Sequence, residues 1–152
     1  MGHISLGGST YWGKITKYSV NDNFGSIIDC KTELELDDDA AYVNWGASWR
    51  MPSYDQLDEL RANCTWAWTT RNGINGSVVT GPNGNSIFLP TSGYRSDSTL
   101  SSVEYSGFYW SYTLNAGGCL NAYFLYFDLG EVRWYHGYRH QGRSVRPVRV
   151  SQ

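Results

Sequence analysis

Histidine is the residue type in this chain best suited to metal or acid–base chemistry, and two histidines stand close together near the C-terminus. His136 and His140 have the i, i+4 spacing that places two metal ligands on one face of a helix. Gly137 lies between them and Gly142 follows shortly after, and the neighbouring residues alternate as in a strand. The third histidine, His3, is far away in the sequence. We therefore expect surface histidines, with no metal site and no bound cofactor.

Arginine is concentrated in the same part of the chain. Residues 130–149 hold five arginines and one glutamate, whereas the whole chain has a net charge of −2. Arginines interleaved with aromatic residues suit contact with single-stranded nucleic acid or with a protein surface. The net charge gives no long-range attraction to nucleic acid or to anionic lipid. The segment is thus a local basic feature on an acidic body.

The cysteines and one acidic run offer further chemistry. Cys30, Cys64 and Cys119 contain no CxxC pair, so a structural zinc site is not expected. A Cys30–Cys64 disulfide and free thiols are both compatible with the sequence. The acidic run at 37–39 has the oxygen ligands of a hard-cation site, but acidic residues at the start of a helix explain it more simply.

The chain of 152 residues is long enough for one domain with a substantial core and short for two. We therefore expect one domain to position these residues. A short helix is predicted near 38–45, ending at Gly46. A second is predicted over 53–63, where Ser53 and Gln56 form a capping box. Seven further segments are typical of strands: 66–70, 77–80, 86–89, 107–114, 121–128, 131–136 and 144–150. Two short helices with antiparallel sheets make the fold class α+β, and no segment is long enough to insert into a membrane.

The strands at 121–128 and 131–136 alternate between two chemically different faces. Residues 105–139 hold 12 of the chain's 24 aromatic residues, more than one buried face and the interior would easily hide. A second core layer beneath the N-terminal residues is the alternative explanation. The apolar face, expected to be buried, carries Tyr123, Leu125, Phe127, Val132 and Trp134. The opposite face, expected to contact a ligand, carries Phe124, Tyr126, Asp128, Glu131, Arg133 and Tyr135.

Several motifs occur together along the chain: WGASWRMP (45–52), NCTW (63–66), GNSIFLP (84–90), SGYR (92–95), YWS (109–111), NAY (121–123) and GRSVRPVR (142–149). Together they resemble the major paralogous domain family of gut Bacteroidetes and their phages, a C-type-lectin-like group. The similarity runs from about 37 to 150, and residues 1–36 match it weakly. The resemblance implies one C-type-lectin-like domain over residues 1–152.

Some members of that group look like the variable proteins of diversity-generating retroelements. In these proteins, adenine-directed mutagenesis rewrites codons of a C-terminal cassette, and the altered residues form a ligand-binding face on a fixed scaffold. The resemblance places this variable cassette at residues 107–150. It implies that the ligand-binding positions are Tyr112, Leu120, Phe124, Tyr126, Asp128, Arg133, Tyr135, His136, Tyr138 and His140.

The resemblance also bears on chemistry that the chain lacks. Related enzymes would carry paired late cysteines or a set of histidines at a metal site, whereas here Cys119 stands alone and His3 is far in sequence from His136 and His140. Calcium-dependent lectins would carry EPN, QPD or WND motifs, and this chain has none of these motifs. Leu125 and Phe127 match the fixed frame of the family, and so do Arg139, Arg146 and Arg149. If these three arginines belong to the scaffold, only Arg133 and Arg143 remain in this segment. Two arginines are too few to bind a series of phosphates along a nucleic-acid strand.

We therefore expect a ligand-binding module rather than an enzyme. Its partner would be a cell-surface protein or glycan, with no nucleic acid and no membrane insertion. The resemblance implies a place on the surface of a phage virion or of a bacterial cell. The alternative is an undiversified, calcium-independent surface lectin of the same fold.

Overall fold

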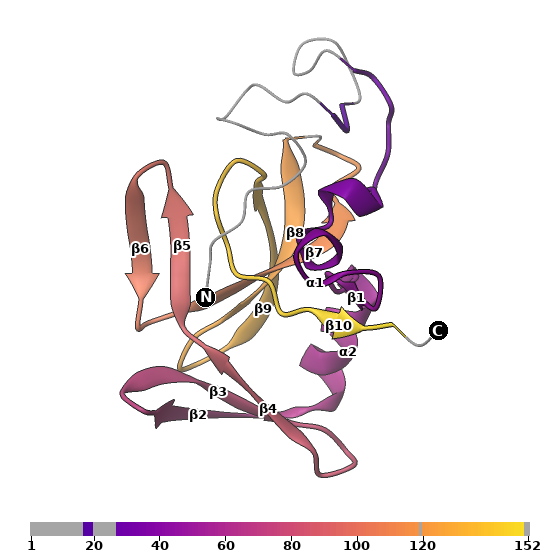
Figure 1. The fold of residues 1–152 in the computed structure, drawn as a ribbon. Helices are drawn as coiled ribbons and strands as arrows, with labels where there is room; N and C mark the ends of the chain where they lie inside the picture. The colour runs from indigo at the N-terminus through magenta and orange to yellow at the C-terminus, as the bar shows by residue number, and fades with distance from the viewer. Residues whose placement is uncertain (1–16, 20–26, 119, 151–152) are drawn as a thin grey trace.

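A computed structural model describes residues 17–19, 27–118 and 120–150 (Figure 1). Predictions from the sequence also concerned residues 1–26 and Cys119. Most of residues 1–26, and Cys119, lie outside the described residues. The helical elements are a 3₁₀ turn η1 (Leu36–Asp38), α1 (Ala40–Trp45) and α2 (Tyr54–Asn63). The strands are β1 (Trp49–Arg50), β2 (Thr65–Arg71), β3 (Ile74–Thr80), β4 (Ser86–Pro90), β5 (Ser92–Ser96), β6 (Thr99–Val103), β7 (Gly107–Leu114), β8 (Asn121–Phe127), β9 (Val132–Tyr138) and β10 (Val148–Arg149). These strands pair antiparallel throughout, which confirms the α+β class.

Both predicted helices form where their caps place them. α1 follows Asp39, whose Oδ1 accepts hydrogen bonds from the backbone N–H groups of Ala41 and Tyr42, and it ends at Gly46 with φ 86°. α2 begins after Ser53 with both hydrogen bonds of the capping box in place. The acidic run therefore supplies a helix cap. No helix in the described part of the chain is long and apolar enough to cross a membrane.

The strands form four small sheets, in the orders β1-β10, β2-β3-β4, β5-β6 and β7-β8-β9. Asn72 and Gly73, both at positive φ, make the two-residue turn between β2 and β3. In Figure 1 the β5–β6 hairpin stands to one side of the β7–β8–β9 sheet and the β2–β3–β4 sheet lies below it. Six of the predicted strands are found with ends within three residues of those expected.

Sequence patterns missed three strands and overextended a fourth. β1 has only two residues, and β5 and β6 are rich in serine, so none of them shows apolar alternation. A strand was predicted over 144–150, but only Val148 and Arg149 of this segment form one, β10. Pro147 has no N–H to donate, and before it Ser144 forms only an isolated bridge with Tyr109.

The β7–β8–β9 sheet is covered on both faces at its centre. On one face Leu125 and Phe127 pack with Leu57 of α2, as the alternation predicted. On the other face Trp110 and Phe124 belong to a second buried cluster, together with residues from the N-terminal half of the chain. The second core layer that was the alternative explanation therefore exists over part of the sheet.

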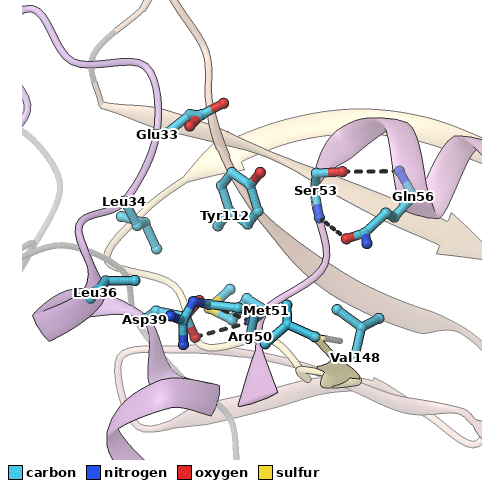
Figure 2. A pocket seen from close by; sticks show the side chains of 11 residues that line it. Glu33, Leu34, Leu36, Asp39, Arg50, Met51, Ser53, Gln56, Tyr112 and Val148 are labelled. Atoms are coloured by element: carbon cyan, nitrogen blue, oxygen red, sulfur yellow. Dashed lines mark hydrogen bonds between the residues drawn. The ribbon is translucent and has the colours of Figure 1, made fainter. Parts of the chain in front are cut away.

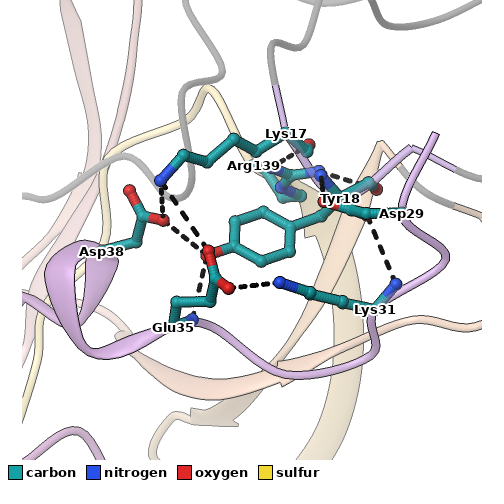
Figure 3. A network of polar contacts seen from close by, with 7 residues as sticks. All are labelled: Lys17, Tyr18, Asp29, Lys31, Glu35, Asp38 and Arg139. Carbon is teal, nitrogen blue, oxygen red and sulfur yellow. Dashed lines mark hydrogen bonds and ion pairs between the residues drawn. The ribbon is translucent and has the colours of Figure 1, made fainter. Parts of the chain in front are cut away.

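Residues 17–19 are tied to this core by two charged side chains (Figure 3). Arg139 is fully buried and donates to the carbonyl oxygens of Lys17 at 3.1 Å and Tyr18 at 3.5 Å. The Tyr18 hydroxyl donates to Asp38 at 2.5 Å, and the Lys17 ammonium pairs with the same carboxylate at 2.8 Å.

Burial alone would raise the pKa of Asp38, but the hydrogen bonds from Lys17 and Tyr18 outweigh it and hold that pKa below its ordinary value. Asp38 therefore stabilises the fold as a carboxylate.

Replacing Asp38 with asparagine is expected to lower the free energy of unfolding by about 1–2 kcal/mol near neutral pH, because two hydrogen bonds lose a charged acceptor. A carboxyl group with a depressed folded-state pKa contributes stability above its unfolded pKa and loses it as the pH falls. Urea denaturation curves of the wild type and Asp38→Asn should therefore converge between about pH 5 and pH 2. The exposed neighbour Asp37→Asn is the control, with a change below about 0.5 kcal/mol. A difference that is the same at both ends of this pH range would contradict the role of the carboxylate.

Candidate ligand-binding surface

Three of the predicted contact residues lie together on one face of β8 and β9. The strand register sets Tyr126 opposite Arg133 and Phe124 opposite Tyr135, so these side chains project from the same face of the sheet. The rings of Tyr126 and Tyr135 meet edge to face with centroids 5.6 Å apart. Tyr135 is 44% exposed, Arg133 is exposed and Tyr126 is half-buried. We term Tyr126, Arg133 and Tyr135 the recognition face.

The recognition face rests on fixed aromatic supports. Phe108 of β7 meets the Tyr126 ring edge to face at 5.2 Å, and Tyr94 of β5 packs on Phe108 at 5.0 Å. The Tyr126 hydroxyl donates to Asp128 at 2.7 Å. The rings are thus held in place before any ligand arrives, which reduces the entropy lost on binding.

Asp128 sets the charge at the edge of the recognition face. The hydrogen bond from Tyr126 lowers the pKa of Asp128, and the N–H groups of Gly130 and Glu131 donate to the same carboxylate at 2.8 and 3.0 Å. Burial raises the pKa of Tyr126, and the negative charge of Asp128 adds to the increase. Glu131 in turn pairs with Arg133. The edge therefore carries the Asp128 carboxylate and the Glu131–Arg133 ion pair.

Sequence reasoning missed two aromatic residues that border this surface. Tyr105, 74% exposed, lines a hollow of about 540 Å³ with Ser106, Asp128 and Leu129. Tyr94 supports the face from the β5–β6 hairpin, which was not predicted. The only local signal for Tyr94 is its place in the SGYR motif, and Tyr105 lies just outside the strand that was expected at 107–114.

Phe124 was expected to contact a ligand, but the structure places its side chain in the interior. Its side chain is 5% exposed. The Trp110 ring meets it edge to face at 5.6 Å, and the Arg143 guanidinium lies 4.2 Å above its centroid. Residues distant in the sequence therefore cover Phe124, which stacks beneath Tyr135 as a support.

Two further predicted positions lie away from the recognition face. His136 pairs in register with Tyr123, and the two rings meet edge to face at 6.2 Å. Because Tyr123 shares its face with Trp134, His136 projects toward the α2 side of the sheet. Tyr112 lines a hollow with Tyr123, also beside α2. The structure thus separates His136 and Tyr112 from the recognition face.

The remaining predicted positions cluster at the far end of β9. The Leu120 carbonyl accepts a hydrogen bond from the Arg139 N–H, and the Tyr138 and His140 rings stack with centroids 5.5 Å apart. Burial lowers the pKa of His140. No group of three or more His, Cys, Asp and Glu side chains gathers as a metal site in the described residues. Cys30 and Cys64 are free thiols, and Cys30 is exposed.

The arginine-rich segment does not form a continuous basic strip. Arg139 and Arg143 are buried, whereas Arg133, Arg146 and Arg149 are exposed. Burial lowers the pKa of Arg143 to about 10, and its guanidinium lies among aromatic rings. Two of the five arginines, Arg139 and Arg143, therefore belong to the interior.

Comparisons with protein-family models, with curated proteins and with solved structures gave no match.

Proposed function

We propose that this chain is a ligand-binding module whose recognition face contacts a protein or glycan on a cell surface. One observation carries the proposal: Tyr126, Arg133 and Tyr135 are adjacent and accessible on a sheet whose centre is packed on both sides. Tyrosine and arginine are enriched among the residues that dominate binding energy, and tyrosine loses little conformational entropy on contact. A rigid aromatic patch of this kind favours recognition over catalysis.

We further propose that the scaffold is C-type-lectin-like and that its contact positions are diversified within the cassette at 107–150. The antiparallel sheets and two short helices support the first part. The second is supported by Leu125 and Phe127, which the resemblance places in the fixed frame and which are fully buried. Arg133 and Tyr135, at positions where such proteins vary, are exposed. Side chains can be rewritten freely only where they do not hold the core together.

The setting that fits this function is the surface of a phage virion or of a bacterial cell. The alternative, an undiversified and calcium-independent lectin, makes a different prediction about the gene. Diversification requires a near-identical template repeat, with adenines at the codons of the variable positions, beside a reverse transcriptase. A genomic neighbourhood with neither feature would leave the undiversified lectin.

Truncating the recognition face is expected to weaken binding strongly. Tyr126→Ala and Tyr135→Ala should each reduce affinity by about tenfold to thirtyfold, as aromatic hot spots do. Arg133→Ala should have a smaller effect, because its guanidinium is solvent-exposed and already paired with Glu131. Binding would be measured by flow cytometry with labelled protein on a panel of Bacteroidetes cells. Prior treatment of the cells with protease or with periodate separates protein from glycan ligands.

Trp45→Ala and Arg71→Ala are the matched controls, since both residues are exposed on other elements, α1 and β2. Circular dichroism of each variant checks that the fold is retained. A folded triple variant of Tyr126, Arg133 and Tyr135 that binds cells like the wild type would show that the ligand contacts another surface.

A further inference from the structure

Two adjoining hollows lie beside the start of α2 and share Glu33, Ser53 and Tyr112. The first has a volume of about 400 Å³, and Figure 2 shows Glu33, Tyr112 and Ser53 among the side chains that line it. The second has a volume of about 390 Å³. We term the second the tyrosine pocket, because it is lined by Tyr54, Tyr112 and Tyr123 together with the acidic residues Glu33 and Asp55. Its size fits a small organic group or one long side chain.

The rings of the tyrosine pocket are held rigidly by the scaffold. Tyr54 stacks on Trp134 at 4.0 Å with an interplanar angle of 21°, and it meets Tyr123 edge to face at 5.3 Å. The indole N–H of Trp134 donates to Asp58 of α2 at 2.7 Å, which fixes the indole against the helix. The pocket wall is therefore formed before a ligand binds.

The two charged side chains that line the tyrosine pocket, Glu33 and Asp55, are both acidic. Neither the Glu33 nor the Asp55 side chain pairs with a described residue, and both residues are exposed. No basic side chain is among the residues that line this pocket. Burial raises the pKa of the Tyr112 phenol, and the negative charges of Glu33, Asp55 and Asp39 raise it further, so their fields converge on this ring.

The start of α2 opposes this field only in part. A helix N-terminus carries about half a positive charge, and the capping box already occupies two of its N–H groups. Glu33 and Asp55 together contribute two negative charges. The net potential at the pocket therefore attracts a cation.

We propose that the tyrosine pocket binds an alkylammonium group, such as a lysine side chain or a choline headgroup. Aromatic faces attract such cations through their quadrupoles, and flanking carboxylates add the Coulomb attraction. The tyrosine pocket lies on the α2 side of the sheet, opposite Tyr126 and Tyr135, so this site is independent of the recognition face. Nothing in the proposed cell-surface function requires it.

The wild-type protein gives the first test, by titration with choline chloride and with Nα-acetyl-lysine amide followed by two-dimensional NMR of backbone amides. At least one of these cations should shift the amide signals of Asp55 and Thr113 in a saturable way, and the tighter of the two identifies the source of the ammonium group. The control ligand is 3,3-dimethylbutan-1-ol, which has the shape of choline without its charge. Equal binding of choline and this alcohol, or no shift with either cation, would overturn the proposal.

Charge-removing variants give the second test. Glu33→Gln and Asp55→Asn should each weaken choline binding by about two- to fivefold, because exposed carboxylates contribute modestly. Glu59→Gln removes the same charge from α2 outside the tyrosine pocket and should leave the affinity unchanged. If Glu59→Gln weakens choline binding as much as Asp55→Asn does, the attraction comes from the net charge of the protein alone. The tyrosine pocket is then not the alkylammonium site.

Discussion

Replacing Asp39 with alanine is expected to lower the free energy of unfolding by about 3 kcal/mol. Asp39 is buried, and its carboxylate accepts hydrogen bonds from the backbone N–H groups of Ala41 at 2.8 Å and Tyr42 at 3.0 Å. The same carboxylate accepts from the N–H of Met51 at 3.0 Å, which joins the start of α1 to the chain leading into α2. Alanine would leave all three N–H groups without this acceptor, and buried N–H groups without an acceptor are costly.

Urea denaturation followed by tryptophan fluorescence would measure this loss. Asp37→Ala is the matched control, because Asp37 belongs to the same acidic run but is exposed, and its effect should stay below about 0.5 kcal/mol. Asp39→Asn should fall between the two, since an amide oxygen accepts hydrogen bonds without the full charge. Equal effects of the alanine variants at 37 and 39 would mean that the acidic run acts only through its net charge.

Alanine at Gly93 is expected to cost about 4 kcal/mol or to prevent folding. Gly93 has a φ of 62°, a conformation in which a side chain costs roughly 1 kcal/mol. A Cβ atom would also lie 2.0 Å from the Ser101 carbonyl oxygen and 2.8 Å from the Val103 nitrogen. Both contacts are with the backbone of β6, which cannot rotate aside as a side chain would. Relief requires β5 and β6 to separate.

Gly73→Ala isolates the crowding from the backbone conformation. Gly73 has a φ of 76° and no atom within 4 Å of the added Cβ, so alanine there should cost only about 1 kcal/mol. Thermal denaturation should place the Gly93 variant roughly 10 °C or more below the Gly73 variant. Equal melting temperatures would show that β6 accommodates the methyl group.

The Gly93 substitution also connects stability to the proposed function. Tyr94 packs on Phe108, and Phe108 supports Tyr126 of the recognition face. A Gly93→Ala protein that still folds should therefore lose part of its cell binding, although Gly93 itself carries no side chain to contact a ligand.

The sequence by itself determined the features that depend on near neighbours along the chain. The Ser53–Gln56 capping box fixed the start of α2, and Asn72-Gly73 fixed the β2–β3 turn, because each needs only residues within a few positions. Period-2 alternation placed Leu125 and Phe127 in the core and Tyr126 with Tyr135 on the opposite face. The serine-rich β5 and β6 gave no such signal.

Only the tertiary structure decided which residues of each face are covered. Alternation assigned Phe124 and Tyr126 to the same face of the sheet. Trp110 and Arg143 bury Phe124, whereas Tyr126 stays accessible. Alternation also assigns His136 to the face of Trp134, and the strand register agrees, although the family resemblance had grouped it with Tyr135. The burial of a strand residue depends on which distant parts of the chain pack against it. The alternation pattern of the strand's own sequence does not contain this information.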